Sequence, residues 1–438
     1  MIWLAVLLPF AGLAGTGKGA AGLAVALFAA LFFIALCDAV VSRREVKRVS
    51  IEGEDIARFA RNRPGNLTLT ILRGAGDEDG NRSRPSSLRL GIPFPDTILP
   101  DTDELTVDLP PSDARFRVQW PCTATARGSY TIKKCFFETP SPMGLWFARN
   151  SCPCKTEIRV YPDLMKERRK LAGVFLNRGT AGAHVQRTIG QGREFEKLRE
   201  YIPGDSYEDI HWKGTAKRGR PVTKLYQIER TQEIYVLIDH SRLSAKAAGA
   251  ETRLEKFLTA SLLLGLVARR QGDHFGLVTF TDKVSRFIRA ASGKGHHNTC
   301  REALYTLKPE PVTPDFDELC SYVRLKLRRR ALLMVLTDLS DPLLAESFLG
   351  NAEALSRQHV VVVFMAQEPG IAPLFSGRPA GNLNDVYRRL GGHIVWHNLR
   401  ELEKKLQRKG IGMTRTEDER LSTELIGRYL QVKARQVL

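Results

Sequence analysis

The first forty residues contain two apolar stretches separated by a short polar loop. Residues 20–41 are almost wholly apolar, and at about 1.5 Å per residue they can span a membrane's hydrocarbon core. The lone acid, Asp38, lies near the end of this stretch, where it can reach the interface. Residues 2–14 are apolar but shorter. The sequence therefore predicts a transmembrane helical hairpin over residues 1–42, or one crossing preceded by a half-inserted arm.

The residues after the second stretch predict its orientation. SRREVKR, at 42–48, carries four basic residues and one acid, so by the positive-inside rule this end faces the cytoplasm. A signal peptide is disfavoured because no basic residue precedes the first stretch. Seven irregularly spaced cysteines also suit a reducing compartment. We predict a protein of the bacterial inner (cytoplasmic) membrane with its soluble domains in the cytoplasm.

From about residue 50 the hydrophobic period becomes two, as in strands. Apolar and polar residues alternate over 66–71, 105–109 and 116–120, and Gly, Pro and Asp clusters separate the runs. This pattern predicts an antiparallel β-sandwich-like module over residues 43–165. The module is interpreted as an interaction module or as a passive spacer.

After residue 231 the pattern is typical of alternating strands and helices. Continuous apolar runs at 233–241 and 331–340 predict strands buried on both faces, and HIVWH at 393–397 is predicted to be a later strand. The alternation predicts an α/β fold with a doubly wound parallel sheet over residues 231–410. A C-terminal helix is expected over residues 411–438.

A net charge of +18 predicts attraction to anionic surfaces. The basic residues form two clusters, which are Lys213, Lys217, Arg218, Arg220 and Lys224, and Arg324, Lys326, Arg328, Arg329 and Arg330. Beside a membrane, contact with anionic lipid headgroups is the simplest use of either cluster, and a solvated face without a partner is the plain alternative. Nucleic-acid binding lacks a recognised module. The sequence also has no phosphate-binding glycine loop and no Gly-x-Ser-x-Gly.

The segment 199–226, REYIPGDSYEDIHWKGTAKRGRPVTKLY, lies in a connector over 166–230 and carries a recognisable motif. It resembles the signature of the domain of unknown function 58 family, Arg-x-Tyr-x-x-Gly-Asp followed by Ile-His-Trp-Lys. The matching residues are Arg199, Tyr201, Gly204, Asp205, Ile210, His211, Trp212, Lys213 and Ala216. Stretches at 126–130, 142–146 and 159–162 and two N-terminal membrane segments fit as well, so the resemblance covers nearly the whole chain.

The resemblance implies a von Willebrand factor type A-like α/β domain. It also implies a MoxR-type AAA ATPase as partner, beside other membrane proteins. We therefore predict a membrane-anchored, non-enzymatic interaction or scaffold protein that serves the assembly or maturation of an envelope complex. Two alternatives stay open, namely a hydrolase that uses His211 and nearby carboxylates, and a binder of polyanions such as nucleic acid.

Two interpretations of segment 199–226 follow from its residues. Ionisable groups around His211 on a turn-rich segment favour a surface site. A clasp between the β module and the α/β domain is the preferred interpretation. It has a tight turn at Gly204-Asp205, a buried Trp212 and an edge strand from Val222. A partner can then dock on its basic edge.

The resemblance also raises the question of a metal-ion-dependent adhesion site. Such a site uses Asp-x-Ser-x-Ser after the first strand, a loop Thr and an Asp after a central strand. The candidates here are Asp239, Ser241, Thr299 and Asp338, with Leu243 in place of the second serine. Their hard oxygens suit Mg²⁺ or Mn²⁺. The alternative is that these polar groups cap the following helices.

Overall fold

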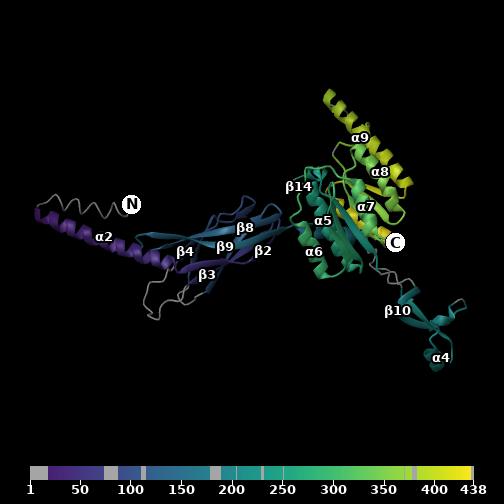
Figure 1. The fold of residues 1–438 in the computed structure, drawn as a ribbon, viewed down its shortest axis with the longest axis horizontal. Helices are drawn as coiled ribbons and strands as arrows, with labels where there is room; N and C mark the ends of the chain where they lie inside the picture. The colour runs from purple at the N-terminus through teal and green to yellow at the C-terminus, as the bar shows by residue number, and fades with distance from the viewer. Residues whose placement is uncertain are drawn as a thin grey trace. The chain divides into compact units, whose positions relative to one another are not determined.

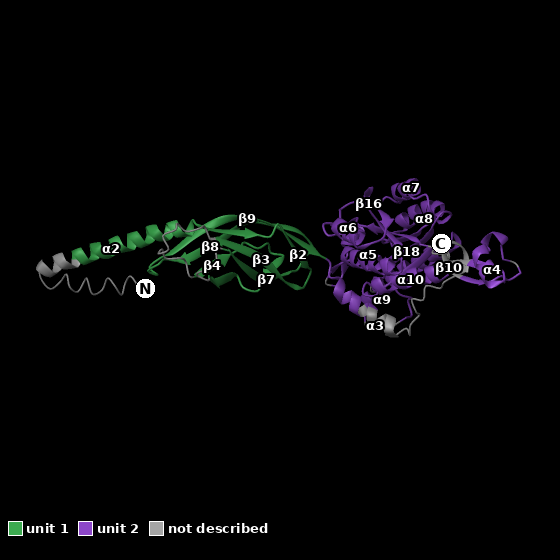
Figure 2. Cartoon of the chain, turned by 90° about the horizontal axis from the view of Figure 1, so that it is seen from below, with its two compact units in different colours: residues 1–161 green, residues 162–438 purple. Residues whose placement is uncertain are grey.

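The chain forms two compact units, residues 1–161 and 162–438, in a computed structural model (Figures 1 and 2). The structure describes residues 18–73, 87–109, 115–177, 189–203, 205–227, 231–249, 251–368, 370–376 and 382–435. The first apolar stretch, residues 2–14, and Gly204 of the signature lie outside these ranges. Each unit is described separately below.

The first unit begins with a long apolar helix, α2 (Lys18–Val46), of which Val25–Val46 is long and apolar enough to cross a membrane. Its last turns pack on the loop before β9. The indole N–H of Trp146 donates to the carbonyl of Ala35 (3.0 Å), and the Met143 N–H donates to Asp38 Oδ1 (3.2 Å). Asp38 is buried beside this loop. The helix is therefore joined directly to the β module.

The β module consists of two sheets enclosing one hydrophobic core. Its strands are β1 (Val49–Gly53), β2 (Ile56–Ala60), β3 (Pro64–Arg73), β4 (Ser87–Gly91), β5 (Ile98–Pro100), β6 (Glu104–Asp108), β7 (Arg115–Ala124), β8 (Gly128–Pro140) and β9 (Phe147–Tyr161). One sheet has the order β1-β3-β7-β5, and the other β2-β9-β8-β4-β6. All pairs are antiparallel except β2 with β9. Trp120, Phe137 and Ile158 are among the buried side chains between them.

The second unit is built on a six-stranded sheet. Its strands are β12 (Glu233–Asp239), β15 (His274–Phe280), β16 (Val284–Ala291), β17 (Leu332–Leu336), β18 (Val360–Ala366) and β19 (Gly412–Thr416). The order is β16-β15-β12-β17-β18-β19, and every pair is parallel except β15 with β16. The sheet is thus mixed and not wholly parallel, because residues 284–291 return as a hairpin partner of β15.

Helices cover both faces of this sheet. They are α3 (Leu164–Asn177), α5 (Arg253–Arg270), α6 (Lys294–Leu304), α7 (Phe316–Lys326), α8 (Pro342–Ser356), α9 (Leu383–Arg408) and α10 (Leu421–Ala434). Residues of α5, α6 and α10 pack with Val236 and neighbouring residues on one face. Residues of α7, α8 and the end of α9 pack with Leu237 and its neighbours on the other. Two apolar layers therefore hold the strand ends in place.

Two sequence predictions in this unit are wrong. HIVWH at 393–397 lies inside α9, because the apolar spacing from Leu383 through Leu390 to Ile394 continues one helix. The region after residue 410 contains β19 as well as α10, and β19 adds a strand to the sheet. β19 is short and carries two threonines and an arginine, so it lacks the apolar run of the other strands. The α/β domain therefore extends through α10.

Candidate functional site

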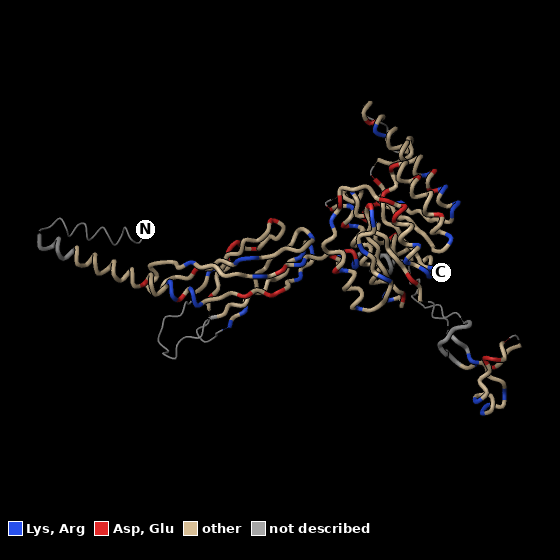
Figure 3. Tube along the Cα trace, in the orientation of Figure 1, with Lys and Arg blue, Asp and Glu red and all other residues tan. Residues whose placement is uncertain are grey.

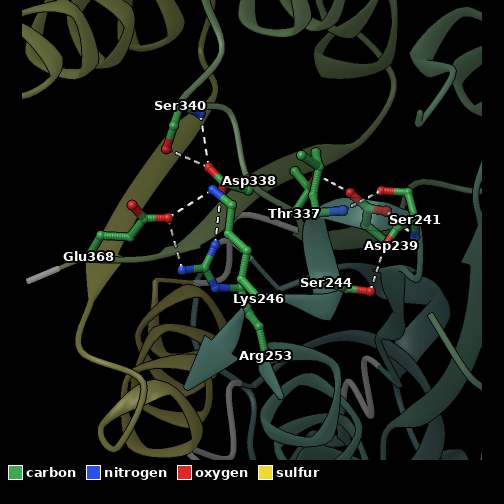
Figure 4. A network of polar contacts seen from close by, with 10 residues as sticks. Asp239, Ser241, Ser244, Lys246, Arg253, Thr337, Asp338, Ser340 and Glu368 are labelled. Atoms are coloured by element: carbon green, nitrogen blue, oxygen red, sulfur yellow. Dashed lines mark hydrogen bonds and ion pairs between the residues drawn. The ribbon is translucent and has the colours of Figure 1, made fainter. Parts of the chain in front are cut away.

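Polar side chains gather where the central parallel strands end. Asp239 closes β12, and Thr337 and Asp338 follow β17, the strand beside it (Figure 4). From β12 the chain adds β15 and β16 on one side and β17, β18 and β19 on the other, so the strand order reverses between β12 and β17. Open parallel sheets bind ligands at such a switch point. Asp239 and Asp338, two of the candidate metal ligands, therefore lie at one edge of the sheet.

Asp239 is engaged by its own neighbours. Its Oδ1 accepts from the Ser241 N–H (2.8 Å), and its Oδ2 accepts from the Thr337 hydroxyl (2.6 Å). Burial raises the pKa of Asp239 above its ordinary value. The Ser241 hydroxyl in turn accepts from the Leu243 N–H, and Ser244 donates to the Ser241 carbonyl (2.8 Å). These bonds shape the turn after β12.

Asp338 is held by two cations. Its Oδ2 accepts from Lys246 Nζ (2.8 Å) and from Arg253 Nη1 (2.7 Å), and its Oδ1 accepts from the Ser340 N–H (2.9 Å) and hydroxyl (2.5 Å). Burial alone would raise the pKa of this carboxyl, but the bonds from Lys246 and Ser340 hold it below its ordinary value. Both oxygens therefore have donors.

Glu368 completes this network from the loop after β18. Its Oε1 lies 2.8 Å from Lys246 Nζ and 3.4 Å from Arg253 Nη2. Two basic and two acidic side chains thus neutralise one another, and Arg253 is only 2% exposed. Sequence reasoning missed Lys246, Arg253 and Glu368. The one available signal was an arginine at the start of α5, a helix whose middle is almost wholly apolar.

The residues at this edge do not fit a divalent cation. A metal bound to Asp338 would lie beside the Lys246 ammonium and the Arg253 guanidinium, which already supply positive charge there. Thr299 does not provide the expected loop hydroxyl, because it lies on α6 and donates to the Gly295 carbonyl. The described residues contain no group of three acidic, histidine or cysteine side chains that could hold a metal. The Mg²⁺ expectation is therefore not supported by the geometry.

We expect Mn²⁺ added to the full-length protein to give only the paramagnetic resonance signal of the free ion. The physical reason is that Lys246 and Arg253 already pair with the Asp338 carboxylate and repel a further cation there. A bound-ion signal that disappears in an Asp239→Asn variant would contradict this account.

The signature segment forms a small hairpin of its own. β10 (Ile189–Glu200) pairs with β11 (Val222–Gln227), and between them lie the turn η1 (Tyr207–Asp209) and the helix α4 (Trp212–Arg218). Asp205 accepts from Arg199 Nη2 (2.6 Å) and from the Ile202 N–H (3.1 Å), which closes the turn. The rings of Tyr201 and Tyr207 stack at 6.0 Å. The motif residues therefore build a local fold.

His211 has a structural partner in this hairpin. Its Nδ1 accepts from the Gly214 N–H (2.8 Å), so the imidazole caps the first turn of α4. A side chain on Gly214 would collide with the ring, since its Cβ would lie 2.6 Å from Nδ1. The same nitrogen is then not free to accept a proton from a substrate. This geometry favours a positioning role for His211.

Trp212 departs from the sequence prediction. It was expected to be a buried anchor, but its side chain is 69% exposed. Ile202 and Tyr207 are also exposed, and we call Ile202, Tyr207 and Trp212 the signature patch. Lys213, Lys217, Arg218 and Arg220 are exposed next to it, so basic residues gather at α4 (Figure 3). The fastening of one domain to the other stays a prediction.

The second basic cluster lies at the end of α7. Arg328 and Arg329 line a pocket of about 410 Å³ together with Glu233, Tyr235, Phe287, Arg289, Lys326 and Leu327. Arg330 is exposed beside them. Four cations and one acid line this pocket, so its walls favour anionic groups. Contact of this surface with lipid headgroups stays a prediction.

Comparison with known proteins supports the resemblance of the signature. Residues 197–371 match the family model described as "Protein of unknown function DUF58". No curated protein matches the chain. Similar solved structures include BatB from Bacteroides thetaiotaomicron, at 15% identity over 47% of this chain and 99% of that one, with a TM-score of 0.30. An aerotolerance-related membrane protein from Bacteroides fragilis is 19% identical over 46% and 98%, with a TM-score of 0.31. The SpRpn10 VWA domain is 11% identical over 45% and 95%, with a TM-score of 0.28.

Proposed function

We propose that this chain, whose residues 197–371 carry the pattern of the domain of unknown function 58 family, is a membrane-anchored interaction protein. One observation supports the proposal above the others. Within the motif, Arg199 donates to Asp205 and His211 accepts from the Gly214 N–H, while Ile202, Tyr207 and Trp212 are left exposed beside a basic run. Such a surface can bind another protein, and it presents no activated nucleophile.

The anchoring helix and the β module act as one body in this proposal. Trp146 and Asp38 join the loop before β9 to the last turns of α2. Met143, Trp146 and Phe147 are also exposed there, and tryptophan favours the headgroup level of a membrane. The basic residues at the end of the helix support a cytoplasmic position for the β module and the second unit.

The partner we propose is a MoxR-type AAA ATPase, on the basis of the family resemblance. The signature patch is its docking surface, and Lys213, Lys217 and Arg218 supply charge for an acidic rim on the partner. The chain then acts as a scaffold that holds the ATPase beside an envelope complex during assembly or maturation. No metal takes part in this docking.

Affinity capture of the full-length protein from detergent-solubilised native membranes tests the proposal, with and without ATP and Mg²⁺. The wild type is compared with Trp212→Ala, and Phe375→Ala serves as the matched control because Phe375 is equally aromatic and 96% exposed outside the signature. We expect an AAA ATPase with the wild type and the control, and its loss with Trp212→Ala. Equal recovery from all three, or no ATPase from any, would contradict the proposal.

The hydrolase alternative receives less support from the geometry. It needs His211 to exchange protons with a substrate or nucleophile, and the His211 Nδ1 is instead used by the α4 cap. Asp205, the carboxylate of the family motif, is paired with Arg199. We therefore propose no reaction at this segment.

A further inference from the structure

Two cysteines face each other across the long hairpin of the β module. Cys135 on β8 and Cys152 on β9 are direct register partners, so their side chains lie on the same face of the sheet. Directly opposed residues of antiparallel strands have Cα atoms about 4.5–5.5 Å apart, within the range that a disulfide bridges. All seven cysteines are free thiols in the structure.

We propose that Cys135 and Cys152 form an oxidisable dithiol that closes to a cross-strand disulfide when it meets a peroxide. The two thiols differ in access, as such chemistry requires. Cys152 is partly exposed, whereas Cys135 is fully buried behind it. Cys152 is thus the thiol that a small oxidant reaches first.

The surroundings favour Cys152 as the attacking sulfur. The Cys152 Sγ lies 3.9 Å from the Cys135 carbonyl oxygen. The proximity of the Cys135 side chain lowers the pKa of Cys152 to about 7, which leaves a substantial thiolate fraction near neutral pH. The pKa of Cys135 is raised by the same contact and by burial. The neighbouring Cys154 is differently placed, because it is buried and its Sγ lies 3.4 Å from the Thr156 hydroxyl.

The oxidation balances in two steps. The Cys152 thiolate attacks one oxygen of hydrogen peroxide, an S–O bond forms as the O–O bond breaks, and hydroxide leaves. The Cys135 sulfur then attacks the Cys152 sulfenic acid, an S–S bond forms as the S–O bond breaks, and its thiol proton leaves with the hydroxide as water. Peroxide is reduced to two water molecules and the two thiols are oxidised. The new bond braces β8 and β9, whose connecting loop holds α2.

Peptide mapping of the full-length protein in detergent tests this proposal. The protein is treated with hydrogen peroxide, remaining thiols are alkylated, and trypsin releases peptides 135–149 and 150–155. We expect the two peptides to be joined, with Cys154 alkylated and the link lost on treatment with a dithiol reductant. The joined species is about 2 Da lighter than the sum of its reduced peptides, because two hydrogens are lost.

Three variants sharpen the result. Cys154→Ser should keep the link, because Cys154 takes no part in it. Cys135→Ser should leave Cys152 as a sulfenic acid that dimedone traps, and Cys152→Ser should abolish both products. A link that needs Cys154, or a wild-type protein whose two peptides stay unjoined while Cys152 is alkylated or overoxidised, would overturn the proposal.

Discussion

Asp338→Ala is expected to destabilise the α/β unit by about 3–5 kcal/mol, because removing one member of a buried ion pair leaves the other charge uncompensated. The charge left behind is that of Arg253, which is 2% exposed and whose Nη1 lies 2.7 Å from Asp338. Hydrogen exchange of the full-length protein, read on peptides from β17 and α5, measures the loss. The variant should exchange faster throughout this unit.

Glu368→Gln is the matched control for this change. Glu368 contacts the same two cations but is 37% exposed, so its loss should cost about 0–1 kcal/mol. If Asp338→Ala is no more harmful than Glu368→Gln, the ion-pair account of this edge is wrong. Because pairing lowers the pKa of Asp338, the stabilisation is present at neutral pH and is lost as the pH falls through the folded-state pKa. Wild type and variant should therefore converge in acid.

Trp120→Ala is expected to destabilise the β module by about 3–5 kcal/mol through the loss of a large buried side chain and the cavity left behind. Trp120 is fully buried, packs edge-to-face with Phe94 at 5.4 Å, and donates its indole N–H to the Thr102 carbonyl (3.1 Å). Hydrogen exchange of peptides from β3 and β7 provides the readout. Peptides from the second unit give the internal reference.

Leu99→Ala is the control in the same module. Leu99 is 54% exposed on β5, so surface truncation there should change the stability by less than about 0.5 kcal/mol. Similar exchange in Trp120→Ala and Leu99→Ala would show that the two sheets do not share the core described here.

The sequence predicted those elements whose hydrophobic pattern is unambiguous. The continuous apolar runs of β12 and β17 predicted strands buried on both faces, and both strands are buried in the structure. The strand β19 was not predicted, because its five residues include polar ones and it lies at the edge of the sheet. HIVWH was misassigned because Ile394 and Val395 favour strands locally, whereas the helix periodicity around them extends over 26 residues.

The candidate site was predicted only in outline, because its decisive contacts are distant in sequence. Asp239 and Asp338 could be placed on one edge, since the ends of parallel strands meet there. The partners of Asp338, however, lie 92 residues away at Lys246 and 85 residues away at Arg253. No pattern within a short stretch of sequence predicts an ion pair between residues so far apart. The burial of Trp212 was predicted wrongly, because a tryptophan in a family motif can be either a buried anchor or an exposed contact residue.

Photo-crosslinking at position 212 tests the central claim most directly. Benzoylphenylalanine is placed at position 212 of the full-length protein, and at position 375 as an exposed aromatic control outside the signature patch. Cells are irradiated, and the crosslinked partner is identified by mass spectrometry. Our account predicts that an AAA ATPase is captured from position 212 and not from position 375. Capture of no ATPase at position 212, or equal capture at both positions, would contradict it.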